Sequence, residues 1–226
     1  MSTAPTRREP LPERPAPDLR VVRLGDLDIR YDARVLQPRP WTTAQAEWAA
    51  ELLESAGPGP VLELCTGAGQ IGLLAIVDND RRLVAVDADP VACDFARHNA
   101  AEAGLIDRVQ VRNAALEEAV GDDERFPVII ADPPWVPSDR TGEHPDDPPF
   151  AIDGGPDGLA LARRCVRVAA RHLTPGGALL LQLASPVQAA ELEHVLADEA
   201  PGLRLTELRQ PAPTGVVLCI RSSPAP

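Results

Sequence analysis

The sequence of 226 residues contains no lysine, so arginine supplies every permanent positive charge on its side chains. Without a lysine amine, the protein cannot form a Schiff base with a carbonyl substrate. The four cysteines show no C-x-x-C spacing, and the four histidines are equally dispersed. The sequence therefore predicts neither a disulfide framework nor a metal site.

Long apolar runs and basic clusters are missing as well. No apolar run approaches the roughly 20 residues that cross a bilayer, and the first 18 residues lack the apolar core of a secretory signal. We therefore expect a cytoplasmic protein without a membrane partner. The formal net charge of −12 and the pI of about 4.7 argue against a nucleic-acid partner, which favours a basic face. The sequence does not indicate the oligomeric state.

The chain divides into a short leading region and a long regular one. Residues 1–18 are rich in proline and charge and predict a disordered arm. Residues 19–226 predict a single domain. Within it, residues 19–57 form a hairpin that turns at Gly25-Asp26 and a helix that Thr42 or Thr43 caps. Residues 58–226 form the core.

In this core, apolar runs alternate with helical segments. Strands buried on both faces and separated by helices are typical of a doubly wound, mostly parallel α/β sheet. The link at 210–215 is too short for a helical crossover, so the last two strands must be antiparallel neighbours. We expect seven strands, at 61–65, 83–88, 109–114, 127–135, 178–185, 203–210 and 215–222.

A glycine-rich turn follows the first of these strands. Gly67, Gly69 and Gly72 form G-x-G-x-x-G, and Asp87 ends the next strand. The pattern fits a dinucleotide, whose pyrophosphate needs the glycines and whose ribose needs the acid, but S-adenosylmethionine also carries an adenosine. Glu63, at the end of the first strand, favours the second cofactor. Its carboxylate would repel a pyrophosphate but attract the ammonium group of the methionine portion.

The fourth strand ends in Asp132-Pro133-Pro134-Trp135. Two prolines stiffen the chain and remove two backbone donors, which leaves carbonyl oxygens as acceptors. Asp132 and the Pro133 carbonyl can then accept the N–H groups of a substrate nitrogen while Trp135 stacks on it. The simpler interpretation is a turn with a tryptophan in the core. Because this segment ends the fourth strand of a chain that also carries Glu63 and the glycine-rich turn, we favour a catalytic site made of Asp132, Pro133 and Trp135.

The loop at 138–157 is acidic and allows two interpretations. One is a solvated loop in which Asp157 helps to cap the helix that follows. The other is a lid over Asp132 that attracts a cationic acceptor, with Arg140 as the exception. The acids in question are Asp139, Glu143, Asp146, Asp147, Asp153 and Asp157.

Five segments of the chain occur in the order typical of the amino-methylases that carry (N/D/S)PP(Y/F/W). They are VLQPRPWT (35–42), ELCTGAGQIGL (63–73), VDADPVACDFARHNA (86–100), ADPPWVPS (131–138) and AIDGGPDGLALARRCVRVAARHLTPGGALLLQL (151–183). From about residue 35 onward the chain resembles class I S-adenosylmethionine-dependent methyltransferases, and among them the HemK/PrmC-like branch. The resemblance implies a Rossmann-like fold and S-adenosylmethionine as the cofactor. It also implies that Asn113 lies near the adenine and that cofactor contacts come from Glu63, Thr66, Gly67, Gly69, Asp87, Ala88, Asn113, Ala114 and Asp132.

The chain departs from that branch at three points. Members that methylate glutamine usually carry Asn-Pro-Pro-Tyr, and the neutral amide of Asn can both donate and accept hydrogen bonds. Asp132 can only accept them while it is ionised, so it favours a donor-rich amine as the substrate. Cys65 replaces the usual first glycine of the loop. Only the arm and hairpin precede the core, where members have a helical domain that engages release factors.

These observations predict an N-methyltransferase that uses S-adenosylmethionine and acts in biosynthesis on a small molecule or peptide. The methylated group is an amino, amide or ring nitrogen. Three alternatives stay open: a release-factor-type protein glutamine methyltransferase, an enzyme that transfers another group of S-adenosylmethionine, and an NAD(P)-binding module.

Overall fold

The computed structural model describes residues 18–212 and 215–224. The predicted disordered arm lies outside these residues, apart from Asp18. No helix within the described part of the chain is long and apolar enough to span a bilayer.

A seven-stranded sheet forms the centre of the molecule, in the strand order β5-β4-β3-β6-β7-β9-β8. The predicted α/β architecture is confirmed: neighbouring strands from β5 to β7 are parallel, whereas β9 is antiparallel to both β7 and β8. The strands are β3 (Val61–Leu64), β4 (Leu83–Asp87), β5 (Val109–Asn113), β6 (Phe126–Ala131), β7 (Leu173–Leu183), β8 (Leu203–Arg209) and β9 (Val216–Ser222).

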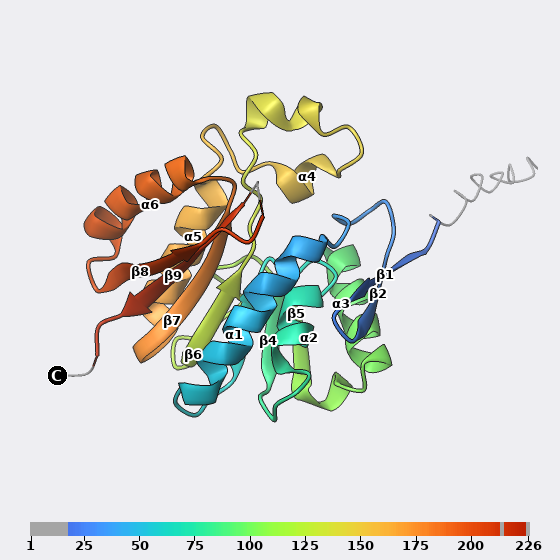
Figure 1. Cartoon of the computed structure of the whole chain (residues 1–226), viewed down its shortest axis with the longest axis horizontal. Coiled ribbons are helices and arrows are strands. Elements are labelled where there is room, and N and C mark those ends of the chain that lie inside the picture. The colour runs from blue at the N-terminus through green and yellow to red at the C-terminus, as the bar shows by residue number, and fades with distance from the viewer. Residues whose placement is uncertain (1–17, 213–214, 225–226) are drawn as a thin grey trace, which may run out of the picture.

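Helices cover both faces of this sheet (Figure 1). Alternate residues of each buried strand face opposite sides, so Leu62 and Leu64 join one core cluster and Val61 the other. The first face lies under α5 (Ala160–His172) and α6 (Pro186–Glu199). The second lies under α1 (Thr43–Ser55), α2 (Gln70–Ile76) and α3 (Pro90–Glu102).

The predicted amino-terminal hairpin is present as β1 (Arg20–Leu24) and β2 (Leu27–Tyr31). It stands beside α3 (Figure 1), where the buried Asn99 side chain fastens it. Asn99 accepts the Arg30 N–H at 2.9 Å and donates to the carbonyls of Arg30, at 3.0 Å, and Ala68, at 2.8 Å. One amide thus holds the hairpin against the glycine-rich turn.

Thr42 occupies the N-cap position of α1, but the predicted capping by a threonine side chain does not occur. Neither hydroxyl accepts a backbone N–H of the helix; Thr42 donates to the Arg39 carbonyl at 2.7 Å, and Thr43 donates to the Pro40 carbonyl at 2.8 Å. The physical reason is Pro40, which begins a 3-10 turn (η1, Pro40–Thr42) directly before α1. Both threonines are already inside a helical turn, where their hydroxyls bond back to the preceding carbonyls.

Candidate active site

The glycine-rich turn connects β3 to α2 and is held by backbone geometry. Cys65, Gly67 and Gly69 all have positive φ, at 58°, 54° and 87°, which glycine adopts readily and cysteine does not. This explains why glycine is usual at position 65. A hydrogen bond with the Cys165 thiol, together with burial, raises the pKa of Cys65, so its thiol stays neutral.

Glu63 lies underneath this turn. Its side chain is 2% exposed; it accepts a hydrogen bond from the Thr66 hydroxyl and another, at 2.8 Å, from the Gly72 N–H. A Cβ at Gly72 would lie 2.4 Å from the Glu63 carboxylate, so the third glycine makes room for the buried acid. Burial raises the pKa of Glu63 to about 7. The carboxylate therefore braces the turn from below.

Asp87 ends β4 and faces the same turn. Its carboxylate accepts the N–H groups of Gly67 and Asp89, both at 2.9 Å. Burial raises the pKa of Asp87, although these two hydrogen bonds favour the ionised form. The acid is therefore fixed in place, with lone pairs left for a ligand hydroxyl.

A cavity of about 300 Å³, which we name the glycine-loop cavity, opens above the turn. Five of the residues predicted to contact a cofactor line it, namely Thr66, Gly67, Asp87, Ala88 and Asp132. Further lining comes from Val35, Leu36, Gln37, Arg39, Thr42, Cys65, Ala68, Gln70, Ile71, Asp89, Ala92, Ala115, Leu116, Pro134, Phe150, Ala151, Leu161 and Arg164.

The other residues predicted to touch the cofactor lie outside the wall of this cavity. Glu63 is beneath the turn, and Gly69 packs against α3, where a Cβ would meet Ala96 at 3.3 Å. Asn113 is exposed and donates to the carbonyls of Asp87, at 3.1 Å, and Ala88, at 3.0 Å. It braces the end of β4 instead of facing the cavity. Ala115 and Leu116 line the cavity in place of Asn113 and Ala114.

A second cavity, of about 380 Å³, lies at the end of β6, and we name it the DPPW cavity. Asp132, Pro133, Pro134 and Trp135 form one side of it. The strand stops at Ala131 because the prolines that follow Asp132 have no N–H to continue the ladder. The remaining lining consists of Leu36, Arg39, Trp41, Thr42, Val136, His144, Asp147, Ala151, Ile152, Gln182 and Ala184.

The two cavities meet at Asp132 and Pro134, which line both. Asp132 is half-buried, and desolvation raises the pKa of its carboxyl to about 7. A group bound in one cavity can therefore reach a group bound in the other beside a single carboxylate. Such an arrangement suits a transfer reaction between two ligands.

Trp135 is fixed by its backbone. The Gln188 side chain donates to the Trp135 carbonyl at 3.0 Å, and a Cβ at Gly158 would lie 2.4 Å from that same oxygen. Gly158 has a φ of 75° and belongs to the Gly-Gly-Pro-Asp-Gly segment that precedes α5. The glycines of this segment thus let it pack directly on the DPPW corner.

The loop at 138–157 covers both cavities. Its base is closed where Val136 pairs with Asp153, and it carries η3 (Ser138–Glu143) and α4 (Pro149–Ile152). Figure 1 shows it standing beyond the end of β6. The loop therefore occupies the position predicted for a lid.

Most acids of this loop are paired, which weakens the idea that it attracts a cation. Glu143 bonds Arg140 at 2.8 Å, and Asp153 accepts the Ser138 hydroxyl at 2.6 Å. Asp157 accepts the Leu159 N–H at 3.0 Å, but Leu159 is itself the N-cap of α5 and no side chain caps this helix, so the predicted capping by Asp157 is wrong.

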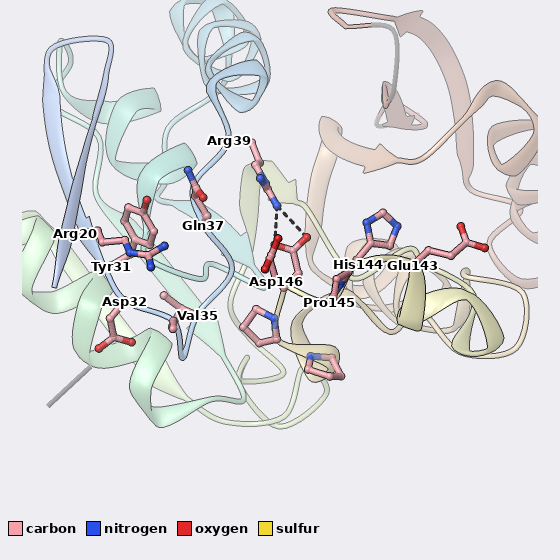
Figure 2. A pocket seen from close by; sticks show the side chains of 14 residues that line it. Arg20, Tyr31, Asp32, Val35, Gln37, Arg39, Glu143, His144, Pro145 and Asp146 are labelled. Carbon is pink, nitrogen blue, oxygen red and sulfur yellow. Dashed lines mark hydrogen bonds and ion pairs between the residues drawn. The ribbon is translucent and has the colours of Figure 1, made fainter. Parts of the chain in front are cut away.

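An open cleft of about 820 Å³, which we name the outer cleft, continues from these cavities. Figure 2 shows the hairpin on one side of it and the loop at 138–157 on the other. Arg39 crosses the space and bonds both carboxylate oxygens of Asp147, at 2.6 and 2.9 Å. Arg39, His144 and Asp147 line both the outer cleft and the DPPW cavity. These three residues therefore form the boundary between the outer cleft and the DPPW cavity.

Sequence comparison finds methyltransferases. The family model described as "Methyltransferase domain" matches residues 61–140. The release factor glutamine methyltransferase of Deinococcus radiodurans is 38% identical over 179 residues, which are 76% of this chain and 63% of that protein. The ribosomal protein uL3 glutamine methyltransferase of Bradyrhizobium diazoefficiens is 35% identical over 177 residues, which are 70% of this chain and 53% of that protein. The chain thus spans less than two thirds of either relative.

Structural comparison leads to the same fold. The crystal structure of a ribosomal protein L11 methylase from Lactobacillus delbrueckii subsp. bulgaricus superposes with a TM-score of 0.63. The two share 18% sequence identity, and the match covers 85% of this chain and 83% of the other. At this identity the likeness concerns the fold alone.

The sheet order is that of the class I S-adenosylmethionine-dependent methyltransferase fold, and the methyltransferase domain model matches residues 61–140 within it. Among proteins of that fold, the matched glutamine methyltransferases show that the chain is similar to the HemK/PrmC-like branch, the resemblance that its motifs indicated. The NAD(P)-binding alternative finds no support in these relatives.

Proposed function

We propose that this protein is a cytoplasmic methyltransferase that transfers a methyl group from S-adenosylmethionine to a side-chain amide nitrogen of a peptide or protein. The observation that carries the proposal is the meeting of two cavities at Asp132 and Pro134. The matched relatives are glutamine methyltransferases by name, which supports the protein-glutamine alternative over a small-molecule acceptor. The outer cleft gives the flanking residues of a peptide room to lie.

The glycine-loop cavity fits S-adenosylmethionine. Two buried oxygens of residues on its wall, Gln70 Oε1 and Asp89 Oδ2, have no hydrogen-bond partner among the described residues. They are acceptors for an ammonium group and for hydroxyls, while Asp87 is placed for a ribose and Leu116 for the apolar adenine face. When bound, S-adenosylmethionine supplies a methyl group on a positively charged sulfur.

The DPPW corner would position the acceptor nitrogen. Asp132 and the Pro133 carbonyl accept its N–H groups, and Trp135 covers it on one side. Their hydrogen bonds direct the lone pair of the nitrogen towards the methyl group and exclude water. The nitrogen would gain the methyl group as the bond from that carbon to sulfur breaks, which leaves S-adenosylhomocysteine, and the proton that the nitrogen loses would pass to the Asp132 carboxylate that accepts its N–H. The negative charge of Asp132 stabilises the positive charge that develops on the nitrogen.

The proposal is tested by incubating the protein with S-adenosylmethionine and a pool of synthetic peptides, each with one glutamine. We expect tandem mass spectrometry to find one added methyl group on the glutamine side chain. The same peptides with glutamate in place of glutamine serve as controls. Methylation of small amines with no methylation of any glutamine peptide or glutamine-containing protein would contradict the proposal.

Asp87→Ala provides a test of the cofactor site. Because the ribose would lose its charged acceptor and the turn would lose the bond to Gly67, we expect S-adenosylhomocysteine to bind about 10- to 100-fold more weakly. Isothermal titration calorimetry measures this affinity. Asp107→Ala, at an exposed position in η2 (Ile106–Arg108), is the matched control. Equal affinity for the Asp87→Ala variant and the wild type would remove Asp87 from the cofactor site.

A further inference from the structure

Gln182 lies near the end of β7, beside the point at which β6 stops. Ala131, the last residue of β6, pairs with Leu181. Side chains alternate along β7: Leu181 and Leu183 enter the core under α5 and α6, whereas Leu180 packs on the α1 face. Gln182 therefore projects on the α1 face, just beyond Leu180, where the DPPW cavity opens.

The side chain of Gln182 is buried but not satisfied. It is 3% exposed, it lines the DPPW cavity, and its Oε1 has no hydrogen-bond partner among residues 18–212 and 215–224. A buried carbonyl oxygen without a donor is unfavourable. A polar side chain buried at this position therefore favours a ligand whose N–H or O–H group supplies the missing donor.

Gln188, which lies nearby, shows the contrast. Its Nε2 donates to the Trp135 carbonyl, and its Oε1 accepts the Ala184 N–H at 2.9 Å, so both ends of the amide hold the protein together. Gln182 Oε1 has no comparable partner within the described chain. Hydrogen bonds within the protein explain why a glutamine stands at position 188, but they do not explain the glutamine at position 182.

The chemistry of the cavity shows what is needed there. An ionised Asp132 accepts hydrogen bonds and cannot donate one. A carboxamide acceptor offers two N–H groups and also a carbonyl oxygen that needs a donor when it is buried. A glutamine side chain carries an acceptor and donors on the same planar group, so two carboxamides can pair edge to edge through two hydrogen bonds.

We propose that Gln182 selects a primary carboxamide as the methylated group. Its Oε1 accepts one N–H of the substrate amide, its Nε2 donates to the amide oxygen, and Asp132 accepts the other N–H. An amine lacks the oxygen and a carboxylate lacks the N–H groups, so neither satisfies both ends of Gln182. This inference rests on the proposed function and adds the residue that distinguishes an amide from an amine.

Two variants test it: Gln182→Glu, which replaces the donor with an acceptor, and Gln182→Met, which removes both at similar volume. On the best glutamine peptide of the wild type, we expect kcat/KM to fall about 10- to 100-fold in each. Activity on the same peptide with lysine at that position should not fall, so the preference for glutamine over lysine shrinks. Gln110→Glu on the exposed part of β5 should leave both rates unchanged.

The affinity for S-adenosylhomocysteine, measured by calorimetry, shows that each variant is folded; should the glutamate variant not fold, the methionine variant decides. An unchanged preference for glutamine in a folded variant would overturn the role of Gln182 and leave the proposed function standing. A wild-type protein that methylates the lysine peptide and no glutamine peptide would overturn both.

Discussion

Replacing Asp132 with alanine is expected to lower kcat about 10²- to 10³-fold while S-adenosylhomocysteine still binds. The carboxylate lies where the two cavities meet, and within the proposed mechanism it both holds an N–H and stabilises the charge that develops on nitrogen. Turnover is measured with the peptide identified in the glutamine screen, and cofactor affinity by calorimetry. The Asp107→Ala control should retain full turnover. Intact turnover in the Asp132→Ala variant would show that the DPPW corner does not contact the acceptor.

The raised pKa of Asp132 adds a pH dependence to this prediction. Only the ionised carboxylate has the proposed role, and desolvation raises its pKa to about 7. We therefore expect kcat/KM to rise with pH, with a midpoint at or below about 7, because the positive sulfur of a bound cofactor favours ionisation. Asp132→Asn, which has no ionisable group at this position, should lose this rise. A wild-type rate that falls between pH 6 and about 7.5 would contradict the role of the ionised form.

Replacing Glu63 with glutamine is expected to make the cofactor-free protein more stable at high pH. Burial raises the pKa of Glu63 to about 7 in the folded protein, above the ordinary value of 4.5. An acid with a raised pKa stabilises the fold fully below its unfolded pKa, and this contribution is lost as the pH rises through the folded pKa. The wild type should therefore lose about 3 kcal/mol of unfolding free energy through this group between pH 4.5 and 8.

A glutamine at position 63 can keep the bond from the Gly72 N–H, and the Thr66 hydroxyl can turn to accept instead of donate. Urea denaturation at several pH values measures the free energy of unfolding of both proteins. The contributions of Asp87 and Asp132 are present in both and largely cancel in the difference. Glu102→Gln, at an exposed position on α3, should follow the wild type. If the unfolding free energies of the wild type and the Glu63→Gln variant changed in parallel with pH, burial would not disfavour the ionised form of Glu63.

The sheet could be predicted from the sequence because its information is local. The run at 128–131 in β6 is apolar on both faces, and the short link before β9 leaves no room for a crossover. The start of β7 is different. Leu173 pairs with Phe126 across an irregularity in the ladder, and the strand therefore begins before the Pro-Gly-Gly segment that was expected to precede it. That pairing depends on two distant segments, which no short window contains.

The residues of the candidate site likewise include some that the sequence indicates and others that only the folded structure reveals. Asp87 and Asp132 end strands, and strand ends gather at one edge of a parallel sheet, so the sequence indicated both. Arg39 and Gln182 gave no such signal. Arg39 matters because it reaches Asp147, over a hundred residues away, and Gln182 because its side-chain oxygen has no partner among the described residues. Both properties arise only from tertiary packing.

The place of β9 between β7 and β8 also has a consequence for the order of folding. β9 follows every other strand along the chain, yet it supplies the pairing that holds the outer side of β7, where Gln182 lies opposite Val217. The parallel strands that carry Asp87 and the glycine-rich turn need no such late insertion. Because long-range pairings form slowly, we expect the cofactor half to mature first during synthesis. The half proposed to bind the acceptor would then be able to bind it only after β9 has paired with β7 and β8.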